Sequence, residues 1–207
     1  MSREEPRAVL GALALGALVA VLTALARAGV YAPIDEMVYE LTPRSSSLPL
    51  IALSETASIY AAAAYVAAAL ILARRRSRGR AEALEFALAM LITTALVAAL
   101  KVAAGVPRPG AEHSEATPLA VLAGHYAFPS GHSSRAAVLA YYAARKRPEL
   151  RWPLWIYAAC VALSRILLGA HWASDVLAGL LVGYWGSKVS ELALGERVRG
   201  RRGGQPG

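Results

Sequence analysis

The sequence predicts an all-α integral membrane protein, a bundle of six transmembrane helices that forms a single membrane domain over residues 1–207. Apolar residues make up 57% of the chain and charged residues only 17%, a composition too apolar for an ordinary soluble domain. The apolar residues also gather in six runs, most of them close to the roughly 20 residues that a helix needs to cross a bilayer. These runs are continuous rather than alternating, which is typical of helices and not of transmembrane strands.

The first two predicted helices cover residues 8–26 and 54–73. The first run contains a single polar residue, Thr23, and the second carries Glu55 near one end. The connection 27–48 contains the segment IDEMVYEL, in which apolar and polar residues alternate. This segment predicts a short amphipathic helix that lies on the membrane surface.

The other four predicted helices cover residues 83–104, about 128–144, 152–168 and 173–193, and the fourth and fifth are short. Gly179 and Gly183 form a GxxxG pattern in the sixth, which predicts close packing against another helix. Residues 83–193 contain the candidate catalytic helices. We expect the basic segment 194–207 to be a disordered tail.

The distribution of basic residues predicts the orientation of the helices. The net charge is +8, and fifteen of the 22 basic residues lie on one side of a six-span topology: Arg3, Arg7, Arg74, Arg75, Arg76, Arg78, Arg80, Arg145, Lys146, Arg147, Arg151, Arg197, Arg199, Arg201 and Arg202. The positive-inside rule makes this side, with both termini, cytoplasmic. Anionic lipid headgroups, and not nucleic acid, are the partners expected for these basic runs.

Polar residues that are unusual in membrane helices gather at the opposite, outer ends of helices three to six. They are Lys101, Arg108, Ser130, Gly131, His132, Arg165, His171 and Asp175. Burying an unpaired ionisable group costs several kcal/mol, so such residues in a membrane protein are candidates for function. The sequence therefore predicts a functional site at the outer face of the membrane.

The chemistry of this set is that of an anion site. Lys101, Arg108 and Arg165 carry more positive charge than the neighbouring acids can neutralise, and the guanidinium group matches phosphate oxygens. The segment FPSGH adds a helix start, where Ser130 caps the helix and Gly131 allows an oxyanion to approach the free N–H groups. Phosphate is the favoured guest.

His171 and Asp175 stand four residues apart at a helix start, so both can lie on one face of the helix. The carboxylate can then accept a hydrogen bond from one ring nitrogen and leave the other nitrogen free as a nucleophile. Taken singly, these residues have structural explanations, such as helix capping by Asp175. Arg135 is either a partner in an ion pair or a ligand, and the role of Glu55 stays open.

Three motifs closely resemble the signature of the type 2 phosphatidic acid phosphatase family, which is related to vanadium haloperoxidases. They are KVAAGVPRP at 101–109, PSGH at 129–132 and SRILLGAHWASD at 164–175. The resemblance implies a phosphatase of six membrane helices that works without a metal or other cofactor. It implies that His171 attacks phosphorus, that Asp175 orients its ring, and that His132 protonates the leaving oxygen and then activates water.

The resemblance also implies that Lys101, Arg108, Ser130, Gly131 and Arg165 hold the phosphate. A membrane site predicts a lipid phosphate or pyrophosphate as substrate, and a polyprenyl pyrophosphate is the favoured one. Phosphatidic acid, phosphatidylglycerophosphate and lipid A phosphate stay open, as does the oligomeric state. The alternatives from other classes are a non-catalytic lipid or anion transporter and a vanadium-dependent oxidase.

Overall fold

The computed structural model describes residues 4–74, 77–111 and 124–200, and in these ranges the chain is helical with no strand. The elements are α1 (Glu4–Arg27), α2 (Ala32–Leu41), α3 (Leu48–Glu55), α4 (Ile59–Leu72), α5 (Ser77–Ala104), α7 (Gly131–Lys146), a 3₁₀ turn η1 (Pro148–Leu150), α8 (Arg151–Leu167) and α9 (Ala173–Gly200). The all-α prediction is therefore confirmed.

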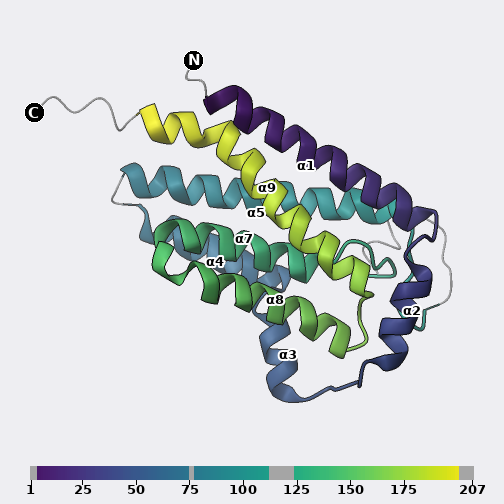
Figure 1. Cartoon of the computed structure of the whole chain (residues 1–207). Helices are drawn as coiled ribbons and strands as arrows, with labels where there is room; N and C mark the ends of the chain where they lie inside the picture. Colours follow the sequence, from purple (N-terminus) through teal and green to yellow (C-terminus); the bar gives the residue numbers. More distant parts are fainter. Residues whose placement is uncertain (1–3, 75–76, 112–123, 201–207) are drawn as a thin grey trace, which may run out of the picture.

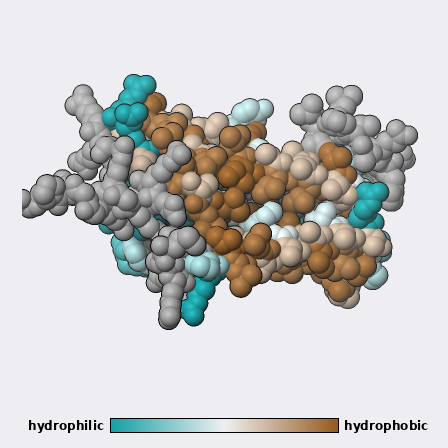
Figure 2. Space-filling model, turned by 90° about the horizontal axis from the view of Figure 1, so that it is seen from above, coloured by the Kyte–Doolittle hydropathy of each residue, from teal (hydrophilic) through white to brown (hydrophobic). Residues whose placement is uncertain are grey.

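The long helices run along one direction and form an elongated bundle (Figure 1). The first turns of α1 and the last turns of α9 lie at one end of this bundle, and α2 crosses its opposite end (Figure 1). In the view of Figure 2, hydrophobic residues fill the middle of the molecule while hydrophilic residues gather toward its two ends. This distribution is the one that a bilayer favours.

Length and composition qualify three helices as membrane spans among the described residues: Pro6–Arg27, Gly79–Ala104 and Pro148–Leu167. The pair α3 and α4, bent by 49° at its break, counts as a fourth if it forms one span. Helix α7 has only 16 residues, and α9 is not among the helices that qualify. The structure thus supports three or four of the six predicted spans on these criteria.

The predicted second helix, 54–73, is not continuous. Helix α3 ends at Glu55, and Ser58 caps α4 by accepting the N–H of Ala61 at 3.2 Å. Arg135 donates its Nε to the carbonyl of Ala57 within the break, at 2.8 Å. The break exposes backbone carbonyls that a regular helix would use itself, and the buried guanidinium satisfies one of them.

Helix α9 extends to Gly200, so the backbone of 194–200 is helical where the sequence led us to expect a disordered tail. For the rest of this segment, the disordered tail stays a prediction. Residues 201–207 lie outside the described part of the chain.

Close contact between α7 and α9 holds the centre of the bundle together. A Cβ atom added at Gly179 would lie 2.5 Å from the carbonyl oxygen of Ser130, and one at Gly183 would lie 2.1 Å from that of Ser134. Neither glycine can carry a side chain without moving α7. The close packing predicted from the GxxxG pattern is confirmed.

A second buried polar cluster joins the first half of α5 to the last turns of α7 and to α9. The carboxylate of Glu85, only 1% exposed, accepts hydrogen bonds from Arg145 and from the hydroxyl of Tyr142. Its backbone carbonyl accepts the hydroxyl of Ser190 at 2.7 Å. The pairing satisfies a carboxylate that would otherwise be very costly to bury.

Candidate active site

The start of α7 forms one wall of the site. Ser130 has extended backbone angles, is fully buried, and accepts the N–H of Ser133 on its hydroxyl at 3.5 Å, as a helix cap does. The cap leaves the N–H groups of Gly131 and His132 without an intrahelical carbonyl. A helix start of this kind attracts anions through its free N–H groups and the helix dipole.

The connection between α8 and α9 forms the facing wall. Nδ1 of His171 lies 3.1 Å from Oδ2 of Asp175, and the same oxygen accepts the N–H of Trp172 at 2.8 Å. Both side chains are buried, with His171 2% exposed and Asp175 fully enclosed. If Nδ1 donates to the carboxylate, a neutral ring keeps Nε2 unprotonated, with a lone pair available for attack.

The ends of α5 and α8 contribute the cations. Lys101 donates to the backbone carbonyls of Tyr126 and Ala127, the latter at 2.9 Å. Arg165 donates its Nη1 to the hydroxyl of Ser54 at 2.7 Å. These contacts fix both side chains in place before any ligand arrives.

The charges of these cations act on the ring of His171. Burial is the largest effect that lowers the pKa of His171 well below its ordinary 6.5, followed by the charges of Lys101, Arg108 and Arg165 and the ring of His132. A cation close to an imidazole disfavours the imidazolium form. The ring is therefore neutral at pH 7, the form in which a histidine is a nucleophile.

Several buried polar atoms of this cluster lack a hydrogen-bond partner among the described residues. They include Nε of Arg108, Nε of Arg165 and Nε2 of His132, and one acceptor, Oδ1 of Asp175. Leaving a buried polar group unpaired costs about 1–3 kcal/mol, so most such groups are paired in folded proteins. Two guanidinium N–H donors and an imidazole close to His171 are suited to an oxyanion such as phosphate.

The break between α3 and α4 lies beside the same cluster. Oε1 of Glu55 is 3.7 Å from Nε2 of His132, and the Glu55 side chain is 56% exposed. Ser54, which holds Arg165, and the break itself were not anticipated from the sequence. A serine within an apolar run carries no recognisable signal of its own.

Arg135 lies against the break between α3 and α4 and close to Gly131 at the start of its own helix. Its Nε is bound to the carbonyl of Ala57, and a Cβ atom added at Gly131 would lie 3.1 Å from its Nη1. A side chain at Gly131 would require this guanidinium to move by a few tenths of an ångström.

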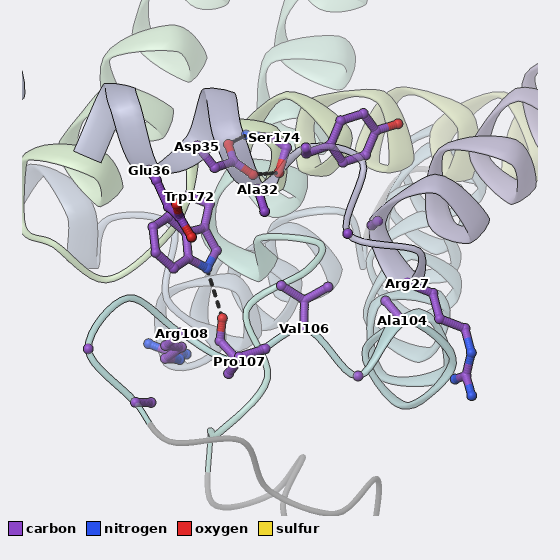
Figure 3. A pocket seen from close by; sticks show the side chains of 16 residues that line it. Arg27, Ala32, Asp35, Glu36, Ala104, Val106, Pro107, Arg108, Trp172 and Ser174 are labelled. Atoms are coloured by element: carbon purple, nitrogen blue, oxygen red, sulfur yellow. Dashed lines mark hydrogen bonds between the residues drawn. The ribbon is translucent and has the colours of Figure 1, made fainter. Parts of the chain in front are cut away.

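A cavity of about 430 Å³ adjoins the cluster at the end of the bundle that α2 crosses. Figure 3 shows Arg108, Pro107 and Trp172 on one side of it and Asp35 with Ser174 on another. Trp172 donates its Nε1 to the carbonyl of Pro107 at 2.8 Å, which fastens the segment that carries Arg108. The cavity reaches Arg108 but not His171 or His132, so it is a neighbour of the site and not its centre.

No group of three or more His, Cys, Asp and Glu side chains within the described ranges has an arrangement that could hold a metal ion. The donors that surround His171 are mainly nitrogen cations, which suit an anion rather than a metal.

The fold and the cluster together define a class: a helical protein of membrane type with a histidine–carboxylate pair set among cations at the ends of its helices. The chain belongs to the PAP2 superfamily, whose family model matches residues 82–196. This range contains all eight site residues predicted from the sequence.

Curated relatives of this chain include phosphatases. It is 39% identical over 66 residues to an undecaprenyl-diphosphatase of Sulfolobus acidocaldarius, a match that covers 31% of this chain and 32% of the relative. It is 31% identical over 131 residues to a lipid A 1-phosphatase of Rhizobium etli, covering 59% of this chain and 56% of the relative. The chain thus spans less than two thirds of the length of these relatives.

Among solved structures, the chain resembles a transmembrane PAP2-type phosphatidylglycerolphosphate phosphatase from Bacillus subtilis. The TM-score is 0.64, the sequence identity 21%, and the match covers 90% of this chain and 96% of the other. At this identity the likeness concerns the fold alone.

Proposed function

We propose that this protein is a membrane lipid phosphatase that hydrolyses a lipid phosphate or pyrophosphate through a phosphohistidine. The observation that carries the proposal is the buried His171–Asp175 pair, with Nδ1 and Oδ2 3.1 Å apart, set among cations. Burial, followed by these charges, lowers the pKa of His171. A neutral, oriented imidazole beside an anion site is the arrangement that covalent phosphoryl transfer requires.

In the first step, Nε2 of His171 attacks phosphorus and the bond between phosphorus and the leaving oxygen breaks. His132, which enters this step in its protonated form, donates a proton to that oxygen and becomes neutral, and Asp175 stabilises the positive charge that develops on the ring of His171. In the second step, His132 takes a proton from water, which attacks the phosphohistidine and releases inorganic phosphate. His171 and His132 then return to their starting states.

Lys101, Arg108, Arg165, the hydroxyl of Ser130 and the N–H of Gly131 hold the phosphate oxygens in both steps. Charge accumulates on these oxygens in the transition state, so fixed donors around them lower the barrier. In this mechanism the positive charge that a metal supplies in other phosphatases comes from side chains, and no step needs a metal or other cofactor.

The proposed topology has six spans, with α3 and α4 together forming the second. Both termini are cytoplasmic, and the site lies at the outer face, near α2. The basic residues at one end of the bundle support this orientation. Helices α7 and α9 can cross the membrane although they are less apolar, because much of their surface is buried against other helices.

A polyprenyl pyrophosphate is the substrate that we favour. A lipid can keep its chain in the bilayer while its headgroup enters a site at the membrane face. The similarity to an undecaprenyl-diphosphatase supports this choice, while similarities to lipid A phosphatases and a phosphatidylglycerolphosphate phosphatase keep those lipids and phosphatidic acid as candidates.

A phosphate-release assay on purified protein in detergent tests the proposal. The panel contains a polyprenyl pyrophosphate, phosphatidic acid, phosphatidylglycerophosphate and lipid A, with His171→Ala as the matched control. We expect release from at least one lipid by the native protein and none by the variant. Binding of these lipids without release from any of them would instead support a transporter.

A further inference from the structure

Helix α2 is fastened to the first turn of α9, directly beside the His171–Asp175 pair. The carboxylate of Asp35 accepts the backbone N–H of Ser174 on Oδ1 at 2.9 Å and the hydroxyl of Ser174 on Oδ2. Asp35 is only 7% exposed, although its helix crosses the end of the bundle (Figure 1). Figure 3 shows this contact at the edge of the cavity.

The contact completes the cap of α9, which begins at Ala173. In a capping box, a residue in the third helical position reaches back to the N–H of the cap residue, and the cap residue's own side chain accepts an N–H of the first turn. Asp175, in the third helical position, makes the backward contact by accepting the N–H of the cap residue Trp172. The side chain of Trp172 has no acceptor atom, so it cannot accept an N–H of the first turn as a cap residue usually does. Asp35 supplies the acceptor from a different helix, 139 residues earlier in the chain.

A second contact joins the same two segments. The ring of Tyr39, one turn after Asp35, lies 5.3 Å from the ring of Trp172 between centroids. Trp172 in turn donates to Pro107, the residue before Arg108. Helix α2 therefore holds the residues that follow His171 and, through Trp172, the segment that carries a proposed phosphate ligand.

We propose that Asp35 is a positioning residue for catalysis: from α2 it holds the first turn of α9 so that Asp175 and His171 keep the geometry needed for attack on phosphorus. This inference rests on the proposed phosphatase function. Small displacements of a reacting group are costly, since a shift of about 1 Å can lower a rate about 100-fold.

Three variants test the inference. Asp35→Ala removes both accepted hydrogen bonds, Asp35→Asn keeps an oxygen that accepts the Ser174 N–H, and Ser174→Ala keeps that N–H while removing the hydroxyl. Glu40→Ala, an exposed acid on the same helix, is the matched control. We expect Asp35→Ala to lower kcat about 10- to 100-fold with KM changed less than twofold. Asp35→Asn and Ser174→Ala should retain most of the activity, and Glu40→Ala all of it.

Hydrogen exchange provides a readout that does not depend on turnover. The amides of residues 171–175 should exchange faster in Asp35→Ala than in the native protein, while Asp35→Asn should restore most of the protection. Unchanged exchange in Asp35→Ala, or a native kcat in that variant, would overturn the inference. So would equal losses in Asp35→Ala and Asp35→Asn, because the charge and not the cap would then be responsible. A native protein that releases no phosphate would refute the proposed function, whereas the exchange result would still decide whether Asp35 holds this turn.

Discussion

The backbone N–H of Ser130 donates to the backbone carbonyl of Asp175 at 2.9 Å. This hydrogen bond joins the start of α7 to the start of α9, and so joins two motifs through residues that are 45 positions apart in the chain. A backbone contact therefore fixes the start of α7, which we propose binds the phosphate, relative to the histidine–carboxylate pair. Side-chain substitutions at the site should leave this arrangement intact, provided that α7 and α9 stay in close contact.

Gly179→Ala should disturb that contact. The added Cβ would lie 2.5 Å from the carbonyl of Ser130, so α7 must move away from α9. We expect the free energy of unfolding to fall by about 1–3 kcal/mol and phosphate release to fall as well. Thermal unfolding in detergent and the release assay measure both effects. Gly11→Ala is the control, because a Cβ there meets nothing within 4 Å; a native-like Gly179→Ala would contradict the packing described here.

Glu85→Ala should lower the free energy of unfolding by disrupting the buried cluster that Glu85 forms with Tyr142 and Arg145. It would leave Arg145 and the hydroxyl of Tyr142 without the carboxylate that binds them, at a cost of about 3 kcal/mol. The folded fraction of Glu85→Ala should keep the native catalytic rate, because Glu85 is not part of the site. For comparison, Glu149→Ala removes an exposed pair with Arg147 and should cost less than about 1 kcal/mol. Equal losses of stability in the two variants would be inconsistent with this difference in burial.

The lowered pKa of His171 predicts a pH dependence of stability. Between that pKa and 6.5, the unfolded chain binds a proton at this residue and the native protein does not. The free energy of unfolding should therefore fall as the pH drops below about 6.5, by up to about 1.4 kcal/mol per pH unit from this group. His171→Gln removes the group, so its stability should depend less steeply on pH between 8 and 5. An unchanged slope in His171→Gln would refute the assignment.

Arg165→Lys should impair phosphate release without unfolding the protein. Lysine keeps the charge but loses the planar group that can bind Ser54 and a phosphate oxygen at once. We expect kcat/KM to fall about 10- to 100-fold, in the range of a single lost transition-state donor. Arg151→Lys, at an exposed position at the start of α8, is the matched control. Native kcat/KM in Arg165→Lys would remove this residue from the proposed phosphate ligands.

Much of the arrangement is predictable from the sequence because membrane helices are long and apolar and their polar residues stand out. The sequence alone indicates that Lys101, His132 and His171 lie together, since each stands at the same end of an apolar run. The break at 56–58 was not predicted, because Thr56 and Ala57 do not interrupt an apolar pattern. The link between Asp35 and Ser174 was also missed, since a contact between distant segments leaves no periodic signal in either one.

The central claim is that His171 is the nucleophile, and trapping the phosphoryl group tests it most directly. The protein is mixed with the lipid that it hydrolyses fastest, quenched under alkaline conditions that preserve phosphohistidine, and mapped by mass spectrometry. We predict a phosphoryl group on His171 in the native protein and none at this position in His171→Ala. An active protein that carries no phosphoryl group on His171, or a His171→Ala variant that still releases phosphate, would contradict the account.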